Sequence, residues 1–319
     1  MPRNICSLTC NLAIAITLSV HFSIPAQAER ILYWTDKDAP RIHRMNADSA
    51  GPLETLLTSA NGIADPRGIV LDPAAGKFYF ADAITQSIRR ANLDGTNVEN
   101  VVTSGQSQPA DMAIDTAAGH LYWSDTAAGA IRRSDLSGNN VTTIRSSLVE
   151  PYFITLDTPG GKIYWSDFNS GIIHRTNLDG TGAVEDFITG LTRVRDVAID
   201  PSSGYIYWAD RNSQRIQRRL IAGGAIQNLF DANDGLLRPH GLVLDPEAGH
   251  LYWTDTDAHA VARGNLDGSG LPLYLATGTN GQVGPWSIAL AVPEPGGMTI
   301  LSLCAACGFA ARHPRPRTA

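Results

Sequence analysis

A short aromatic motif that ends in aspartate recurs six times along this chain of 319 residues. It reads YWTD, YFAD, YWSD, YWSD, YWAD and YWTD, and its tyrosines are Tyr33, Tyr79, Tyr122, Tyr164, Tyr207 and Tyr252. Successive tyrosines are therefore 46, 43, 42, 43 and 45 residues apart. Self-similarity at this period indicates a repeat architecture, in which each copy contributes one structural unit.

Each copy of the motif is surrounded by the same parts. An apolar run that ends in aspartate precedes the second to sixth copies, at residues 68–72, 112–115, 154–157, 197–200 and 241–245, and a glycine follows that aspartate four residues later. We expect this glycine to take a positive φ in a tight turn. An I-x-R-like segment and a short outer segment follow the motif. Four short strands per period of about 40–45 residues describe the blade of a β-propeller.

The two ends of the repeat region complement each other. The first copy lacks a preceding apolar run, whereas the sixth is followed by PWSIALA at 285–291, which aligns with PRGIVLD at 66–72 and has Ala291 in the aspartate position. We expect 285–291 to supply the inner strand of the first blade. The sequence thus predicts an all-β, six-bladed propeller of four-stranded antiparallel blades over residues 29–291.

The six tetrapeptides resemble the YWTD repeats of the low-density-lipoprotein-receptor family, over about residues 31–291. Phe80 in place of tryptophan, serine or alanine in place of threonine, and Ala291 depart from that pattern. The resemblance implies a six-bladed propeller whose channel-mouth face binds protein ligands.

An arginine follows each motif aspartate by eight residues. We expect each pair to form a buried ion pair across a hairpin, because the guanidinium group suits a carboxylate. One active site would need one constellation, so six equivalent pairs favour a structural role. The pairs are Asp36 and Arg44, Asp82 and Arg90, Asp125 and Arg133, Asp167 and Arg175, Asp210 and Arg218, and Asp255 and Arg263.

Function is expected where the repeats differ. One position near the start of each inner strand reads Arg67, Ala110, Tyr152, Arg195, His240 and Trp286, and the next reads Gly68, Asp111, Phe153, Asp196, Gly241 and Ser287. We expect both positions at the mouth of the central channel. Arginine and aromatic residues are common in binding hot spots, although ordinary rim variation would also explain the differences. The candidate ligand-binding residues are Arg67, Asp111, Tyr152, Arg195, Asp196, His240 and Trp286.

The two termini read as targeting signals. Residues 1–28 have the apolar core and the small-residue cleavage pattern of a secretory signal peptide. Residues 292–319 contain Pro-Glu-Pro, a short apolar segment and a basic end, and resemble the PEP-CTERM sorting signal of bacteria, which implies processing by an exosortase; a plain C-terminal anchor is the alternative. All four cysteines, Cys6, Cys10, Cys304 and Cys307, fall in these segments. We expect an exported protein of the cell envelope, surface or medium, held to the membrane only through its tail.

The sequence favours binding over catalysis. No HExxH, P-loop, GxSxG or GxGxxG motif occurs in the body, and a net charge of −6 argues against a nucleic-acid binder. We expect a non-enzymatic module, without metal or cofactor, that recognises a protein or a glycan. The alternative is a propeller enzyme of the metal-dependent lactonase or lyase type. Its ligands would be Asp111, Asp196 and His240, beside which Arg67 and Arg195 disfavour a cation.

Overall fold

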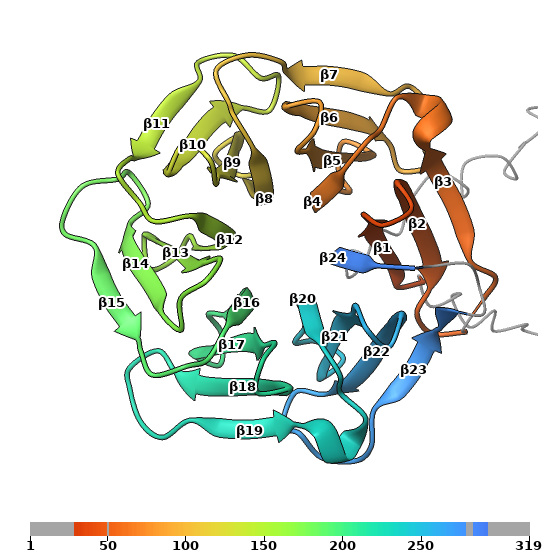
Figure 1. Cartoon of the computed structure of the whole chain (residues 1–319), viewed down its shortest axis with the longest axis vertical. Helices are drawn as coiled ribbons and strands as arrows, with labels where there is room; N and C mark the ends of the chain where they lie inside the picture. Colours follow the sequence, from red (N-terminus) through yellow and green to blue (C-terminus); the bar gives the residue numbers. More distant parts are fainter. Residues whose placement is uncertain (1–28, 50, 279–282, 293–319) are drawn as a thin grey trace, which may run out of the picture.

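The computed structural model describes residues 29–49, 51–278 and 283–292. Six four-stranded antiparallel sheets surround a central axis, as Figure 1 shows, and each sheet runs from an inner strand to an outer strand at the rim. The prediction of an all-β, six-bladed propeller is therefore confirmed. The expected signal peptide and nearly all of the expected sorting signal lie outside the described residues.

We number the blades in the order of their YWTD motifs and give their strands from the axis outward. Blade 1 contains β24 (Pro285–Ala291), β1 (Ile31–Asp36), β2 (Arg41–Asn46) and β3 (Glu54–Thr58). Blade 2 contains β4 (Pro66–Asp72), β5 (Lys77–Asp82), β6 (Ser87–Asn92) and β7 (Glu99–Val102). Blade 3 contains β8 (Pro109–Asp115), β9 (His120–Asp125), β10 (Ala130–Asp135) and β11 (Thr142–Arg145).

The remaining blades follow the same order. Blade 4 contains β12 (Pro151–Asp157), β13 (Lys162–Asp167), β14 (Ile173–Asn177) and β15 (Glu185–Ile188). Blade 5 contains β16 (Val194–Asp200), β17 (Tyr205–Asp210), β18 (Arg215–Leu220) and β19 (Gln227–Phe230). Blade 6 contains β20 (Pro239–Asp245), β21 (His250–Asp255), β22 (Ala260–Asn265) and β23 (Leu273–Ala276). Among the described residues, two 3-10 turns, η1 (Ser59–Asn61) and η2 (Ala232–Asp234), follow outer strands.

The ring closes through the C-terminal strand. β24 pairs antiparallel with β1, with Ala291 opposite Ile31 and Ile288 opposite Trp34. In Figure 1 the blue β24 accordingly lies inside the red strands of blade 1. Without β24, the inner edge of β1 would have no partner, so this pairing removes an exposed sheet edge.

The aromatic residues of the motif form the layers between blades. The tryptophans of the five YW motifs are at most 1% exposed, and Phe80, which replaces the sixth, is fully buried. Tyr79 of blade 2 packs in one cluster with Met112 and Trp123 of blade 3. Large rings thus fill the space between neighbouring sheets, where burial of apolar area stabilises the fold.

The motif aspartates hold loops rather than the predicted arginines, although Asp125 also pairs with the neighbouring Arg132 at 3.0 Å. Asp82 accepts hydrogen bonds from the backbone N–H groups of Ala64 and Asp65, at 2.7 and 3.2 Å, in the loop that enters the inner strand of its own blade. Asp255 does the same for Leu237 and Arg238, at 2.8 and 2.9 Å. Asp36, Asp125 and Asp210 bind the equivalent loops of their blades. In blade 4, Asp167 instead contacts His174 at 3.0 Å.

The predicted aspartate–arginine pairing is therefore wrong. In each hairpin the arginine lies opposite the motif tyrosine, for example Arg44 opposite Tyr33. In blades 1, 2, 4 and 5 its head group contacts the outer strand, as in the 2.7 Å contact of Arg90 Nε with Glu99. The same cross-strand register joins Tyr33 to Arg44, Tyr79 to Arg90, Tyr122 to Arg133, Tyr164 to Arg175, Tyr207 to Arg218, and Tyr252 to Arg263, so the arginines at these positions do not reach Asp36, Asp82, Asp125, Asp167, Asp210 or Asp255.

The third motif residue connects neighbouring blades. The Thr254 hydroxyl accepts from the N–H of Gly241 in its own inner strand and donates to the carbonyl of Trp286 in blade 1, both at 2.7 Å. Thr35, Ser124 and Ser166 donate in the same way to the inner strand of the next blade. Alanine stands at this position in blades 2 and 5. The hydroxyl thus explains why threonine and serine interchange here.

The turns that leave the inner strands have the predicted conformation. The glycines that follow each inner-strand aspartate have φ values between 62° and 72°, which L-residues with a side chain rarely adopt: Gly76, Gly119, Gly161, Gly204 and Gly249. The aspartates cap the turns, as Asp72 does by accepting from the N–H of Ala75 at 3.0 Å. Five carboxylates therefore mark this end of the channel.

Candidate functional site

The predicted ring of residues does converge on the axis, but it fills the channel instead of lining an open mouth. Arg195 and His240 are fully buried, and Tyr152 and Trp286 are 3% and 8% exposed. The Trp286 ring lies 3.7 Å from the His240 ring and 6.3 Å from that of Tyr152, measured between centroids. We call these four residues, with Phe153, the aromatic plug. It closes the channel at the end where the inner strands begin.

Arg195 is held inside the plug by aromatic faces. Its guanidinium carbon lies 4.4 Å from the centroid of Phe168 and 5.6 Å from that of Tyr152, and Nη1 donates to the Phe168 carbonyl at 2.8 Å. Burial, with a smaller contribution from Arg193, lowers the pKa of Arg195 to about 9. Arg195 therefore serves as packing and as a buried positive charge, and it is not a contact surface.

His240 is held neutral. Burial is the main cause that lowers its pKa well below the usual value, and the positive charges of Arg195 and Arg211 act in the same direction. Its Nδ1 lies 3.3 Å from the Trp286 carbonyl oxygen, which makes this nitrogen the N–H donor. His240 is enclosed by the plug and lies apart from Asp111 and Asp196, which line a separate cavity on the inner side of the plug.

The expectation that all seven candidates form one exposed mouth is thus corrected. Tyr152, Arg195, His240 and Trp286 belong to the buried plug, Asp111 and Asp196 line a cavity beyond it, and Arg67 is the half-buried exception. The guanidinium of Arg67 pairs with Asp65 at 2.8 Å on the outer side of the plug. The physical reason is convergence: six inner strands approach the axis so closely that large side chains on them meet.

A shallow pocket of about 250 Å³ lies over the outer side of the plug. Edges of Tyr152 and Trp286 form its floor together with Phe168, and its polar rim consists of Lys37, Arg67, Gln108, Thr126 and Glu150. Lys37 Nζ lies 4.9 Å from the Trp286 ring centroid, within the range of a cation–π contact. The comparison of repeats missed the rim because Lys37, Thr126 and Phe168 follow second strands and Gln108 and Glu150 precede inner strands, outside the compared positions.

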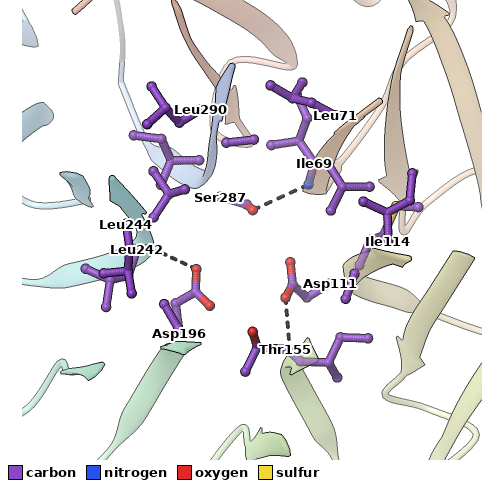
Figure 2. A pocket seen from close by; sticks show the side chains of 18 of the residues that line it. Ile69, Leu71, Asp111, Ile114, Thr155, Asp196, Leu242, Leu244, Ser287 and Leu290 are labelled. Carbon is purple, nitrogen blue, oxygen red and sulfur yellow. Dashed lines mark hydrogen bonds between the residues drawn. The ribbon is translucent and has the colours of Figure 1, made fainter. Parts of the chain in front are cut away.

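On the inner side of the plug, a cavity of about 380 Å³ occupies the channel (Figure 2). Asp111 and Asp196, 5% and 6% exposed, point into it from β8 and β16 and face each other across it. Asp111 Oδ2 accepts from the N–H of Ile154 at 3.0 Å, and Asp196 Oδ2 from that of Leu242 at 2.8 Å. Each carboxylate therefore connects its blade to the next one.

The apolar surroundings of the cavity strongly affect these acids. Burial raises the pKa of Asp111 to about 7, although its hydrogen bonds oppose the shift. Burial, followed by repulsion from Asp111, raises the pKa of Asp196 well above its usual value. Two neighbouring carboxyl groups in an apolar site cannot both ionise easily.

In blades 2 and 6, glycine at the equivalent position leaves room for these bridges. Asp111, Asp196 and Ser287 occupy equivalent positions in blades 3, 5 and 1, and the N–H of Ile69 donates to Ser287 Oγ at 3.4 Å. Between them, a Cβ on Gly68 would lie 2.6 Å from the Cα of Asp111, and a Cβ on Gly241 would lie 2.4 Å from the carbonyl oxygen of Trp286. Part of the variation in the ring thus reflects close packing of the inner strands.

Within the described ranges, no group of three or more His, Cys, Asp or Glu side chains is arranged to hold a metal ion. Over the same ranges, no helix is long and apolar enough to cross a membrane.

Comparisons with known proteins agree with the geometry. The propeller in the crystal structure of a nidogen/laminin complex superposes with a TM-score of 0.72 and 21% identity, covering 82% of this chain and 98% of that one. This likeness shows the fold. The mouse protein Nidogen-2 is 34% identical over 84 residues, which are 25% of this chain and 6% of that protein. The chain thus matches only a small part of this curated relative.

Two lyase structures share the architecture at lower similarity. Virginiamycin B lyase from Staphylococcus aureus has a TM-score of 0.51 and 19% identity, covering 66% of this chain and 69% of that one. A streptogramin B lyase has a TM-score of 0.53 and 16% identity, covering 66% and 67%. No protein-family model matches the sequence.

Proposed function

We propose that this protein is an exported, non-enzymatic binding module that recognises a protein or a glycan at the plugged end of its propeller. The observation that carries the proposal is the shallow pocket over the plug. It combines Tyr152 and Trp286 with Arg67, and tyrosine, tryptophan and arginine are the residue types enriched in binding hot spots. The nidogen propeller that superposes on this chain comes from a complex with laminin, which supports a protein partner.

The rigid floor of the pocket favours recognition. The rings of Tyr152 and Trp286 are fixed by packing against Phe153 and His240, so a ligand would not have to immobilise them on binding. Pre-organised aromatic side chains lower the entropic cost of association. In this proposal, Arg195 and His240 support the floor, while Lys37 and Arg67 contact the ligand.

The lactonase or lyase alternative would require its ligands to line one cavity. Asp111 and Asp196 share the channel cavity, but His240 lies in the plug beyond it. The side chain of Arg195 also points into the plug, and Arg67 lies on its outer side. The two candidate acids are therefore separated from the other proposed site residues. We favour binding for this reason.

The location and export parts of the proposal rest on the sequence. The signal-like residues 1–28 and the PEP-CTERM-like residues 292–319 support an envelope, cell-surface or extracellular position, with an exosortase-type enzyme as the processing partner of the tail. The nidogen likeness is compatible with an exported propeller.

The test compares capture by matched variants. Purified wild-type protein, a Lys37→Ala/Arg67→Ala variant and a Lys162→Ala control are immobilised and exposed to envelope proteins and to a glycan array. Lys162 lies at the opposite end of the channel, in a 2.7 Å hydrogen bond with Asn177. We expect a ligand retained by wild type and control but weakened at least about tenfold in the double variant. Equal capture by all three would remove the plugged end as the binding face.

A further inference from the structure

The channel cavity is a blind pocket with an apolar wall and an acidic floor. The plug closes one end, and the other opens beside Pro73 and Pro246, where the inner strands finish. Each inner strand contributes one aliphatic side chain near that opening: Leu71, Ile114, Leu156, Ile199, Leu244 and Leu290. Figure 2 shows such side chains around the two carboxyl groups of Asp111 and Asp196. Pockets of this size and composition commonly take small ligands.

The acids on the floor have no cationic partner in the pocket. None of the described residues that line it is Lys, Arg or His. Asp111 and Asp196 accept backbone N–H groups, yet each carboxylate has further lone pairs that can point into the cavity. Buried carboxylates are normally paired with a cation, because an isolated charge in apolar surroundings is costly. The cavity supplies the space in which such a cation would fit.

The charge at the opening suits the same class of ligand. Asp72, Asp115, Asp157, Asp200 and Asp245 end five inner strands at this end of the channel. One of them, Asp245, pairs with Arg30 at 2.5 Å. The other four accept hydrogen bonds from turn N–H groups and add negative charge at this end of the channel, which favours the approach of cations.

We propose that the channel cavity binds a primary ammonium group on an unbranched aliphatic stem, with the ammonium between Asp111 and Asp196 and the stem against the aliphatic wall. An ammonium group offers three N–H donors, enough to bond both carboxylates at once. A free alkylamine and a lysine side chain of a partner polypeptide carry this same chemistry. The inference is independent of the proposed function, because the two sites lie on opposite sides of the plug and share no lining residue.

Isothermal titration calorimetry of the purified protein tests the proposal with four probes: n-pentylamine, 1-pentanol, a blocked Gly-Lys-Gly peptide and calcium chloride. We expect saturable binding of pentylamine and at least about tenfold weaker binding of the alcohol, which lacks the charge. Binding of the peptide in addition would indicate a lysine side chain as the source, whereas binding of pentylamine alone would indicate a free amine. Equal affinity for amine and alcohol, or binding of calcium alone, would overturn the proposal.

Variants assign the binding to the floor. Asp111→Asn and Asp196→Asn should each weaken pentylamine binding by about tenfold or more, while Asp65→Asn, which removes a carboxylate on the other side of the plug, should leave it unchanged. Unchanged binding in both cavity variants would overturn the assignment.

A second pair of variants tests the ammonium site while leaving Asp111 and Asp196 unchanged. Thr155 lines the cavity beside Asp111 and Asp196 (Figure 2). Thr155→Lys would place an ammonium group there within the same chain, and Thr155→Met would add a neutral chain of similar length. We expect the lysine variant to melt at a higher temperature than the methionine variant and to lose pentylamine binding. A lower melting temperature for Thr155→Lys would contradict an ammonium site.

Discussion

At the scale of single residues, we expect loss of the motif aspartate to lower the stability of the fold more than loss of the motif hydroxyl. The hydroxyl forms neutral hydrogen bonds, each contributing about 1 kcal/mol, and alanine replaces it at Ala81 and Ala209. The aspartate is present in all six copies. In five of them it accepts two successive backbone N–H groups that would otherwise be left without a partner. Loop anchoring therefore accounts for the motif aspartate in five of the six copies.

Asp82 provides the test at this scale. The side chain is fully buried and binds the N–H groups of Ala64 and Asp65, so we expect Asp82→Ala to lower the free energy of unfolding by about 3 kcal/mol. Arg90→Leu should act separately, because Arg90 bonds Glu99. Urea unfolding of both single variants and the double variant measures the coupling. We expect a coupling below about 0.5 kcal/mol, the value for independent sites.

A large coupling energy between Asp82 and Arg90 would support the ion pair that the sequence suggested.

The spacing of aspartate and arginine in the sequence could not show whether the two side chains meet, since the register of a hairpin depends on its turn. Four residues separate β1 from β2, so Asp36 lies opposite Arg41 and, three positions back along the hairpin, Tyr33 lies opposite Arg44. An arginine eight residues after the motif aspartate therefore lies opposite the motif tyrosine. The alternation of side chains along the strand then decides which face of the sheet the arginine occupies.

At the scale of strands, closure by β24 could be predicted because it follows from alignment of one repeat with another. The pattern PWSIALA matches the other inner strands even though Ala291 lacks the aspartate. Its ladder with β1 extends from Ile31 opposite Ala291 to Asp36 opposite Pro285. Asp36 also accepts from the N–H groups of Val283 and Gly284, which fixes the entry to the strand.

Truncation tests the closure. A chain ending at Gly284 loses β24, which exposes the edge of β1 and the side chains that β24 buries. We expect it to lose cooperative thermal unfolding or to aggregate. The matched control ends at Val292, keeps every strand and should unfold as the full chain does. Circular dichroism and size-exclusion chromatography compare the two. A monomer ending at Gly284 that melts like the control would show that β24 does not close the ring.

At the scale of the whole molecule, the sequence predicted which varied residues form a ring around the axis, but not whether that ring is exposed or buried in the channel. Repeats align by position along the strand, so Tyr152, Arg195, His240 and Trp286 could be assigned to one level. Whether that level is open depends on the width of the channel and on how the rings pack, and neither quantity is encoded in the alignment. The cavity beyond the plug was missed for the same reason. The only sequence signal for it was the pair Asp111 and Asp196.

This pair predicts how the stability of the whole molecule depends on pH. Burial raises the pKa of Asp111 to about 7, and the pKa of Asp196 also lies well above its usual value. Between about pH 4 and pH 7 the unfolded chain has released protons that the folded chain retains, so the free energy of unfolding falls as pH rises. The contribution of these two carboxyl groups to the free energy of unfolding is fully present below the pKa that they have in the unfolded chain. It is lost as the pH rises through their pKa in the folded chain.

We therefore expect wild-type protein to lose more Tm between pH 5 and pH 8 than the Asp111→Asn/Asp196→Asn variant, in which neither group titrates. Asp65→Asn is the control for a lost carboxylate outside the cavity and should follow wild type. Burial lowers the pKa of His43 to about 4 and that of His240 well below normal, which opposes the trend, but both histidines remain in every variant and cancel in the comparison. Scanning calorimetry across this range measures the effect. If the wild-type and double-variant curves run parallel, the two carboxyl groups are ionised in the folded protein and the cavity is more polar than its wall indicates.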